Sequence, residues 1–151
     1  MSTIHFVEKT TATPEQFLAG LTDFGPARSD LFGNSAAGYL KVRDQGDDWA
    51  DVTEGSNGIW ERLRYDWSDP HRVVMTTTDS NLWGGRSSHT YTLTPQPDGT
   101  TVLDVVVVRE GKNLKGRLTA LLLSSIGKTV LSKALKNTIK AIEERNTAAD
   151  R

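Results

Sequence analysis

The C-terminal part of the chain, from about Gly111 to Asn146, carries apolar residues at intervals of three and four. This spacing is typical of a helix with one broad apolar side. At 1.5 Å per residue such a helix would be roughly 50 Å long. That is longer than a small domain is wide, so we expect bends at Gly116 and Gly127. The apolar stripe consists of Leu114, Leu118, Leu121, Leu122, Ile126, Val130, Leu131, Ala134, Leu135, Ile139 and Ile142.

The N-terminal segment predicts one strand followed by two short helices. Thr3–Lys9 alternates weakly between apolar and polar residues, which favours a strand. Thr13–Gln16 is a strong helix start, because threonine can cap a helix, proline suits its first position and glutamine completes a capping box. A second short helix is expected over Ala27–Phe32.

The middle of the chain changes to a period of two, broken at short intervals by turn residues. Because every connection is short, neighbouring strands should pair antiparallel as a meander. Helices segregated from strands indicate the α+β class. We expect a curved, seven-stranded antiparallel sheet whose concave side is filled by the long helix. The six strands of this region are Tyr39–Asp44, Trp49–Glu54, Ile59–Trp67, Arg72–Thr78, Arg86–Thr94 and Thr100–Arg109.

Length and composition indicate one domain over residues 1–146, with Thr147–Arg151 as a disordered tail. The chain has no cysteine, which excludes disulfides and thiolate chemistry. Its N-terminus lacks the profile of a signal peptide, and no apolar run approaches the ~20 residues of a membrane span. We therefore expect a cytoplasmic protein.

Charge is distributed unevenly along the chain. Residues 1–108 carry 8 basic and 15 acidic side chains, whereas residues 109–151 carry 10 basic and 4 acidic ones. Such asymmetry can mark a surface for nucleic acid or a membrane. The lysines are spaced out without an arginine cluster or interleaved aromatics, so no nucleic-acid partner is expected. We favour a basic helix docked on an acidic body, and peripheral contact with a membrane stays open.

Several segments together resemble a known superfamily. They are Ala12–Glu15, Thr22–Pro26, Trp60–Trp67, Asp79–Asn81 and Gly116-Arg117. In this arrangement the chain resembles the helix-grip fold of START-type lipid-binding domains, the birch-pollen-allergen family and bacterial polyketide cyclase/dehydrases, the SRPBCC superfamily. It looks like a small actinobacterial member. The resemblance implies a cavity between sheet and long helix that holds an apolar small molecule. Some members catalyse cyclisation or dehydration there, while many only bind or carry.

One face of the predicted strand Ile59–Trp67 carries Glu61, Leu63, Tyr65 and Trp67 and is the better candidate to face the helix. Glu61 would then be a carboxylate in an apolar cavity. Desolvation should raise its pKa and suit it to proton transfer. The alternatives are an ion pair with an arginine of a neighbouring strand or a position at a solvated cavity mouth. Together these alternatives are favoured.

His89 and Tyr91 share one face of a later strand. If that face points inward, they are the natural acid–base pair for an enolising substrate. A single buried histidine is, however, more often a hydrogen-bonded core residue, and that interpretation is favoured.

Trp83 lies in a loop beside Gly84-Gly85, which would give it mobility near a cavity entrance. We hypothesise that it forms a lid together with Leu31-Phe32. The expected ligand-binding residues are Leu31, Phe32, Leu63, Tyr65, Trp67, Trp83, Leu122, Ile126 and Val130.

Three functions compete. The favoured one is a binder or carrier of a hydrophobic small molecule such as a lipid, polyketide or isoprenoid. The second is a cyclase or dehydratase in which Glu61, His89 and Tyr91 move protons. The third is an interaction module that uses the basic helix. No pattern supports a nucleotide, metal or flavin site, so no cofactor is expected. Monomer and homodimer both remain open.

Overall fold

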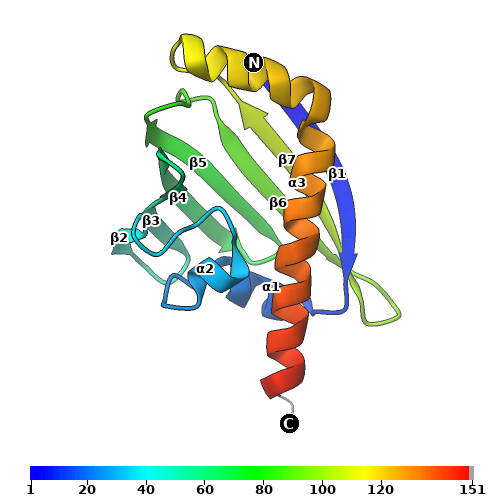
Figure 1. Cartoon of the computed structure of the whole chain (residues 1–151). Coiled ribbons are helices and arrows are strands. Elements are labelled where there is room, and N and C mark those ends of the chain that lie inside the picture. Colours follow the sequence, from blue (N-terminus) through cyan, green and yellow to red (C-terminus); the bar gives the residue numbers. More distant parts are fainter. Residues whose placement is uncertain (150–151) are drawn as a thin grey trace.

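The computed structural model describes residues 1–149, which form a seven-stranded antiparallel sheet and three helices (Figure 1). The predicted α+β class and element order are confirmed, and every strand begins and ends within two residues of its expected bounds. The elements are β1 (Ser2–Thr10), α1 (Pro14–Leu21), α2 (Arg28–Leu31), β2 (Lys41–Gln45), β3 (Trp49–Ser56), β4 (Ile59–Asp69), β5 (Arg72–Ser80), β6 (Ser88–Pro95), β7 (Thr101–Arg109) and α3 (Leu114–Ala149).

The start of α1 has the expected capping box. The Gln16 backbone N–H donates to Thr13 Oγ1 at 3.1 Å, and the Thr13 N–H donates to Gln16 Oε1 at 2.9 Å. Phe17 and Leu21 on the inner side of α1 are fully buried. Figure 1 shows α1 and α2 together at one end of the sheet, where they close that end of its concave side.

The strand order is β1-β7-β6-β5-β4-β3-β2, and all neighbours are antiparallel. This register places side chains from six strands in one row across the concave face, because paired residues point to the same side. The row consists of Ala50, Tyr65, Met75, His89, Val107 and Ile4. His89 therefore lies in the middle of the inner face of the sheet.

The β3–β4 hairpin turns through Asn57 and Gly58, whose φ angles are 52° and 81°. Two successive residues in the left-handed region are the signature of the type I′ turn, for which Asn-Gly is the preferred pair. The turn matters for function because it projects Ser56 and Asn57 over the concave face, beside the loop that follows α2.

Helix α3 has two parts that meet at a bend: the first crosses one end of the sheet and the second runs down its concave side (Figure 1). Leu135, Ile139 and Ile142 of the second part are buried in the core. The expected bend is present, but Gly116 lies in the first turn of α3 and does not produce it. A Cβ on Gly116 would lie 2.2 Å from the carbonyl oxygen of Leu82, so glycine is needed there for close backbone contact.

The first part of α3 corrects the prediction that its apolar stripe faces inward. Its inner face carries small side chains, because the helix lies very close to Leu82 and β1. The large apolar residues point away from the protein with 47% to 73% of their surface exposed. We call these residues the outer strip: Leu114, Leu118, Leu121, Leu122, Ile126 and Val130.

Within the described residues, α3 is the one helix that is long and apolar enough to cross a membrane, judged by length and composition alone. In its most apolar segment, 17% of the residues are buried. Its second part is nevertheless an integral element of the core. The expected disordered tail, Thr147–Arg151, is helical as far as Ala149, and Asp150 and Arg151 lie outside the described residues.

Candidate functional site

Two adjoining compartments, of about 270 and 370 Å³, lie between the concave face of the sheet, the loop after α2, the β3–β4 hairpin and α3. Small-molecule sites in proteins typically measure about 300–1,000 Å³. Together the compartments therefore offer room for a ligand of ordinary drug size. The residues that line both are Phe32, Asn34, Ser56, Asn57, His89 and Tyr91.

The walls of both compartments are largely apolar. Ile59, Leu63 and Met75 contribute to the first. The second is lined chiefly by side chains of β1, β7 and α3, among them Phe6, Val105, Val107, Val130, Leu131, Ala134 and Leu135. Exposed Asn34 and Asn57 belong to both linings and mark where the cavity opens to solvent.

A buried polar network forms one end of the first compartment. Arg28 Nε donates to Glu54 Oε1 at 2.8 Å and Arg28 Nη2 to the Tyr65 hydroxyl at 2.8 Å, while that hydroxyl donates to Glu54 Oε2. The Arg28 guanidinium also lies 4.1 Å from the centre of the Phe32 ring, within the range of a cation–π contact. Burial, followed by the charge of Glu54, raises the pKa of Tyr65 well above its ordinary value. This network holds α2 and its following loop to the sheet.

A second network joins Glu61, Arg109 and His89. Arg109 Nη1 donates to Glu61 Oε2 at 2.7 Å, and Nη2 donates to His89 Nε2 at 3.1 Å. Thr77 Oγ1 also donates to Glu61 Oε2. The side chains of Glu61 and Arg109 are only 12% and 10% exposed. Trp83 covers the other side of this arginine, with its ring centre 4.9 Å from the guanidinium carbon.

The protonation state of Glu61 differs from the expected one. Burial alone would raise its pKa, but the charge and hydrogen bonds of Arg109 outweigh that effect and hold the pKa below its ordinary value of 4.5. Glu61 is thus an ion-paired carboxylate, but its partner lies on β7, which β5 and β6 separate from β4, and not on a neighbouring strand as the alternative weighed from the sequence had it. The expectation of a raised pKa is wrong, because Arg109 was not anticipated as its partner.

His89 is neutral in this environment. Burial and then the neighbouring Arg109 charge lower its pKa from 6.5 to about 3. Because Nε2 accepts a hydrogen bond from arginine, the ring proton must lie on Nδ1. Nδ1 is enclosed and has no partner within the described part of the chain. The lowered pKa makes His89 a poor proton acceptor at neutral pH.

Tyr91 supplies the second polar group at the junction of the compartments. Within residues 1–149 its hydroxyl makes no hydrogen bond, and burial raises its pKa to about 12. A neutral phenol in this position can donate to, or accept from, one polar group of an otherwise apolar molecule. It gives the cavity an orienting polar group at this junction.

The structure brings some of the sequence-predicted site residues together and separates others. Glu61, His89, Tyr91, Phe32, Leu63 and Tyr65 line the first compartment, and Val130 lines the second. Leu31 is buried in the core, and Trp67 packs against the core outside both linings. Leu122 and Ile126 belong to the outer strip, away from the cavity.

Trp83 does not have the geometry of a mobile lid. It is 7% exposed, packs with Leu82 and Ala120, and forms a β-bridge with Gly111. Its neighbourhood is thus fixed by the first turns of α3. The Phe32 part of the hypothesised lid does lie at the cavity, beside the exposed Asn34.

Three charged residues of these networks were not anticipated from the sequence. Arg109 continues the inward alternation of Leu103, Val105 and Val107, and Glu54 continues that of Ala50 and Val52. The alternation of buried and exposed residues along each strand therefore predicts that both side chains point inward. Arg28 lies in a four-residue helix, where no period exists to reveal its direction.

Comparisons with known proteins identify the fold but not a close relative. No protein-family model and no curated protein matches the sequence. The structure is similar to a START superfamily protein from Mycobacterium smegmatis, with 12% identity over 96% of this chain and 97% of the other and a TM-score of 0.68. It is also similar to the Zhui aromatase/cyclase from a Streptomyces strain, with 14% identity over 99% and 95% of the two chains and a TM-score of 0.70. A Thermus thermophilus protein has 15% identity over 99% of both chains and a TM-score of 0.71.

These similarities establish that the chain has the START-like helix-grip fold, as the sequence resemblance implied. The same fold accommodates proteins described as START domains and as an aromatase/cyclase. The function therefore has to be argued from the cavity itself.

Proposed function

We propose that the protein binds or carries a hydrophobic small molecule, such as a lipid, polyketide or isoprenoid, in the two-compartment cavity. The observation that carries this proposal is the lining: apolar walls surround a junction at which the Tyr91 hydroxyl has no hydrogen-bond partner within residues 1–149. Such a site suits a largely apolar ligand with one or two polar groups.

The states of the titratable groups favour binding over proton transfer. Arg109 holds Glu61 as a carboxylate, and the low pKa of His89 makes its ring a weak base. A general base works best when its pKa lies near the operating pH. Both groups therefore serve better as fixed polar walls of a pocket than as shuttles for protons.

Filling the cavity from its rim tests the proposal without disturbing the core. Ser56 lies on the hairpin and lines both compartments, so Ser56→Trp should abolish binding of a fluorescent fatty acid. Ser68→Trp, at an exposed position near the end of β4 and outside this cavity, is the matched control and should bind like the parent chain. Equal binding by both variants would place the ligand elsewhere and refute the proposal.

The Tyr91 hydroxyl can be tested separately. Tyr91→Phe keeps the ring and removes one hydrogen bond, so affinity for a ligand with a polar group should fall about two- to tenfold. Thr92→Val, which removes a hydroxyl from the same strand β6 outside the cavity lining, is the control. An unchanged affinity in Tyr91→Phe would remove this residue from the binding site.

The second candidate function is a cyclase or dehydratase, favoured by the convergence of Glu61, His89 and Tyr91 on the first compartment. Incubation with a poly-β-keto thioester would test it. Cyclised or dehydrated product that disappears in Glu61→Gln or His89→Gln would establish the enzyme. A ligand recovered unchanged would leave binding as the function.

A further inference from the structure

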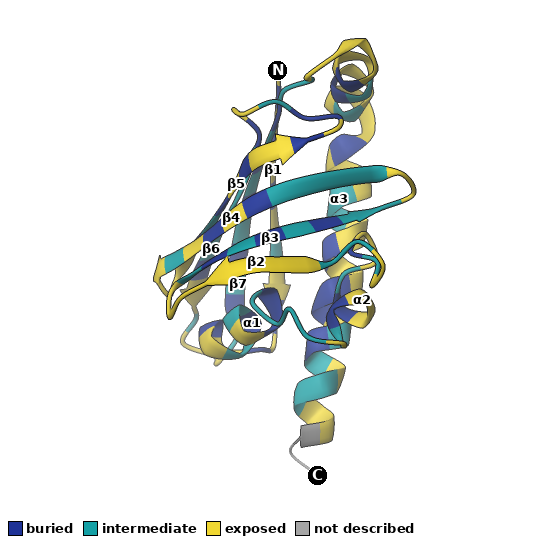
Figure 2. Ribbon diagram, turned by 90° about the vertical axis from the view of Figure 1, so that its left-hand side faces the viewer, coloured by how far each residue is buried: buried dark blue, intermediate teal, exposed yellow. Residues whose placement is uncertain are grey.

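The first part of α3 buries its small residues and exposes its large apolar ones, which is the opposite of the usual amphipathic helix. Its inner face carries Gly116, Ala120 and Gly127, all buried, whereas the six larger apolar residues of the outer strip face solvent. Exposed surface dominates this part of the helix in Figure 2, in contrast to the buried face of the second part. A contiguous exposed apolar patch of this kind usually marks an interaction surface.

The same helix is strongly basic. Between Glu110 and Glu143 the chain contains seven lysine or arginine side chains and no acidic one. Lys115, Arg117 and Lys128 are exposed and make no ion pair within residues 1–149. The outer strip is therefore accompanied by uncompensated positive charge.

We propose that the outer strip docks on the surface of an anionic phospholipid bilayer, with the first part of α3 lying in the plane of the interface. An apolar face that enters the acyl region, accompanied by lysine and arginine that contact the headgroups, is the chemistry of an interfacial helix. A membrane supplies an apolar layer and negative charge in one partner.

Other occupants fit the charge or the apolar surface, but not both. A second copy packed strip to strip would bring two basic helices together, which like-charge repulsion opposes. Nucleic acid would match the charge but not a row of leucines that lacks aromatic side chains for base stacking. The combination of charge and apolar area thus selects the bilayer.

The docking surface adjoins the cavity, because Val130 belongs to both the outer strip and the lining of the second compartment. A docked bilayer would lie next to that compartment. The inference does not depend on the proposed function, since an empty cavity would leave the strip and its charge unchanged.

Flotation with lipid vesicles tests the proposal. The full chain should float with vesicles of equal parts phosphatidylcholine and phosphatidylglycerol, bind pure phosphatidylcholine far less, and lose binding as salt is raised. Lys115→Gln/Arg117→Gln should weaken binding roughly thirtyfold, at about 1 kcal/mol per charge. The matched control is Lys41→Gln/Arg43→Gln on the exposed strand β2, which should bind like the parent chain.

The apolar contribution is tested by Leu118→Ser/Leu122→Ser. Both leucines are more than half exposed, so the thermal midpoint should stay unchanged while vesicle binding falls about tenfold or more. Because the chain has no cysteine, Leu122→Cys can carry a single nitroxide, whose spectrum should report burial in the acyl region only with anionic vesicles.

Three outcomes would overturn the proposal. One is the absence of binding to anionic vesicles. Another is binding that the leucine and charge variants leave unchanged. The third is a stable dimer, seen by light scattering, that Leu118→Ser/Leu122→Ser converts to a monomer, which would assign the strip to a second copy of the chain.

Discussion

Replacing Arg109 by methionine removes the positive charge that keeps Glu61 ionised while preserving an apolar side chain against Trp83. Removing one partner of a buried ion pair costs about 3–5 kcal/mol, because the other charge remains without compensation. Each of these side chains keeps about a tenth of its surface exposed, so we expect about 3 kcal/mol. For a chain of this length that lowers the thermal midpoint by about 6–12 °C.

The pH dependence of stability gives a sharper test, because the contribution of Glu61 changes sign between the parent chain and Arg109→Met. In the parent chain the folded-state pKa of Glu61 lies below 4.5, so its contribution to stability is present above pH 4.5 and is lost as pH falls through the folded-state pKa. In Arg109→Met, burial becomes the dominant influence and the pKa rises above 4.5. In the variant the Glu61 contribution to stability should then be greatest in acid and be lost as pH rises through the raised pKa.

Urea unfolding followed by tryptophan fluorescence, between about pH 5 and pH 8, measures this effect. Adding Glu61→Gln to Arg109→Met removes the stranded carboxylate. The double variant should regain most of the lost stability, because no uncompensated charge then remains buried. The difference in pH slope between the single and double variants isolates Glu61 from all other titrating groups.

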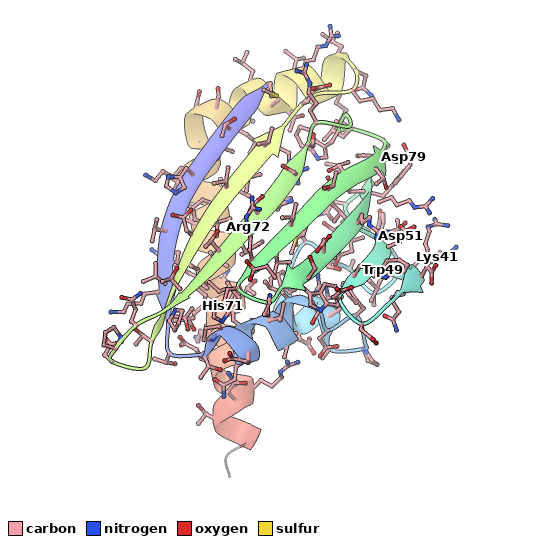
Figure 3. The ribbon with its side chains drawn as sticks, turned by 180° about the vertical axis from the view of Figure 1, so that it is seen from behind. Lys41, Trp49, Asp51, His71, Arg72 and Asp79 are labelled. Atoms are coloured by element: carbon pink, nitrogen blue, oxygen red, sulfur yellow. The ribbon has the colours of Figure 1, made fainter. Side chains whose placement is uncertain are left out.

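The matched control is the Asp51–Arg62 pair on the outer face of the sheet. Arg62 donates to Asp51 at 2.6 and 2.9 Å, but its side chain is 41% exposed, and Figure 3 shows Asp51 on the face opposite α3. Arg62→Met should therefore lower stability far less than Arg109→Met does. The reasoning is refuted if Arg109→Met costs no more than this control, or if the stability of Arg109→Met relative to Arg109→Met/Glu61→Gln does not fall as pH rises over the same range.

Two further predictions concern His89 and Gly116. Since the pKa of His89 is lowered to about 3, stability should be complete above pH 6.5 and fall below it by up to about 1.4 kcal/mol per pH unit. In urea titrations, His89→Gln should flatten this dependence of stability on pH. His5→Gln, at an exposed site, is the control and should leave it unchanged. Equal slopes in the two variants would contradict a buried, neutral His89. Gly116→Ala should lower the free energy of unfolding by about 1–3 kcal/mol, because the new Cβ would clash with the Leu82 carbonyl. Gly85→Ala is the control: it has open space around it and should change the urea midpoint little. An unchanged urea midpoint in Gly116→Ala would contradict the close backbone contact.

Periodicity predicted which residues share a face of each strand, and that was enough for much of the site. His89 and Tyr91 share a face and line the same compartment, together with Glu61 of β4. Strand alternation succeeds because only two faces exist and one of them is covered by the helices. The same alternation places Glu54 and Arg109 on the inner face, because each lies an even number of residues from a buried valine of its strand.

The orientation of α3 could not be predicted in this way. A helical period shows that Leu118, Leu122 and Ile126 share a side, but not that this side meets the protein. Gly116 and Gly127 decide the matter, because only small side chains allow the first part of α3 to approach Leu82 and β1. Tertiary packing of small residues thus overrode the expectation that the most apolar face is the buried one.

Native mass spectrometry of the protein purified from its own host tests the central claim most directly. The account predicts a defined apolar molecule bound at one copy per chain, released on denaturation and absent from Ser56→Trp. A protein that is empty from its host and binds no lipid, polyketide or isoprenoid from a broad panel would contradict the claim that the cavity is a binding site.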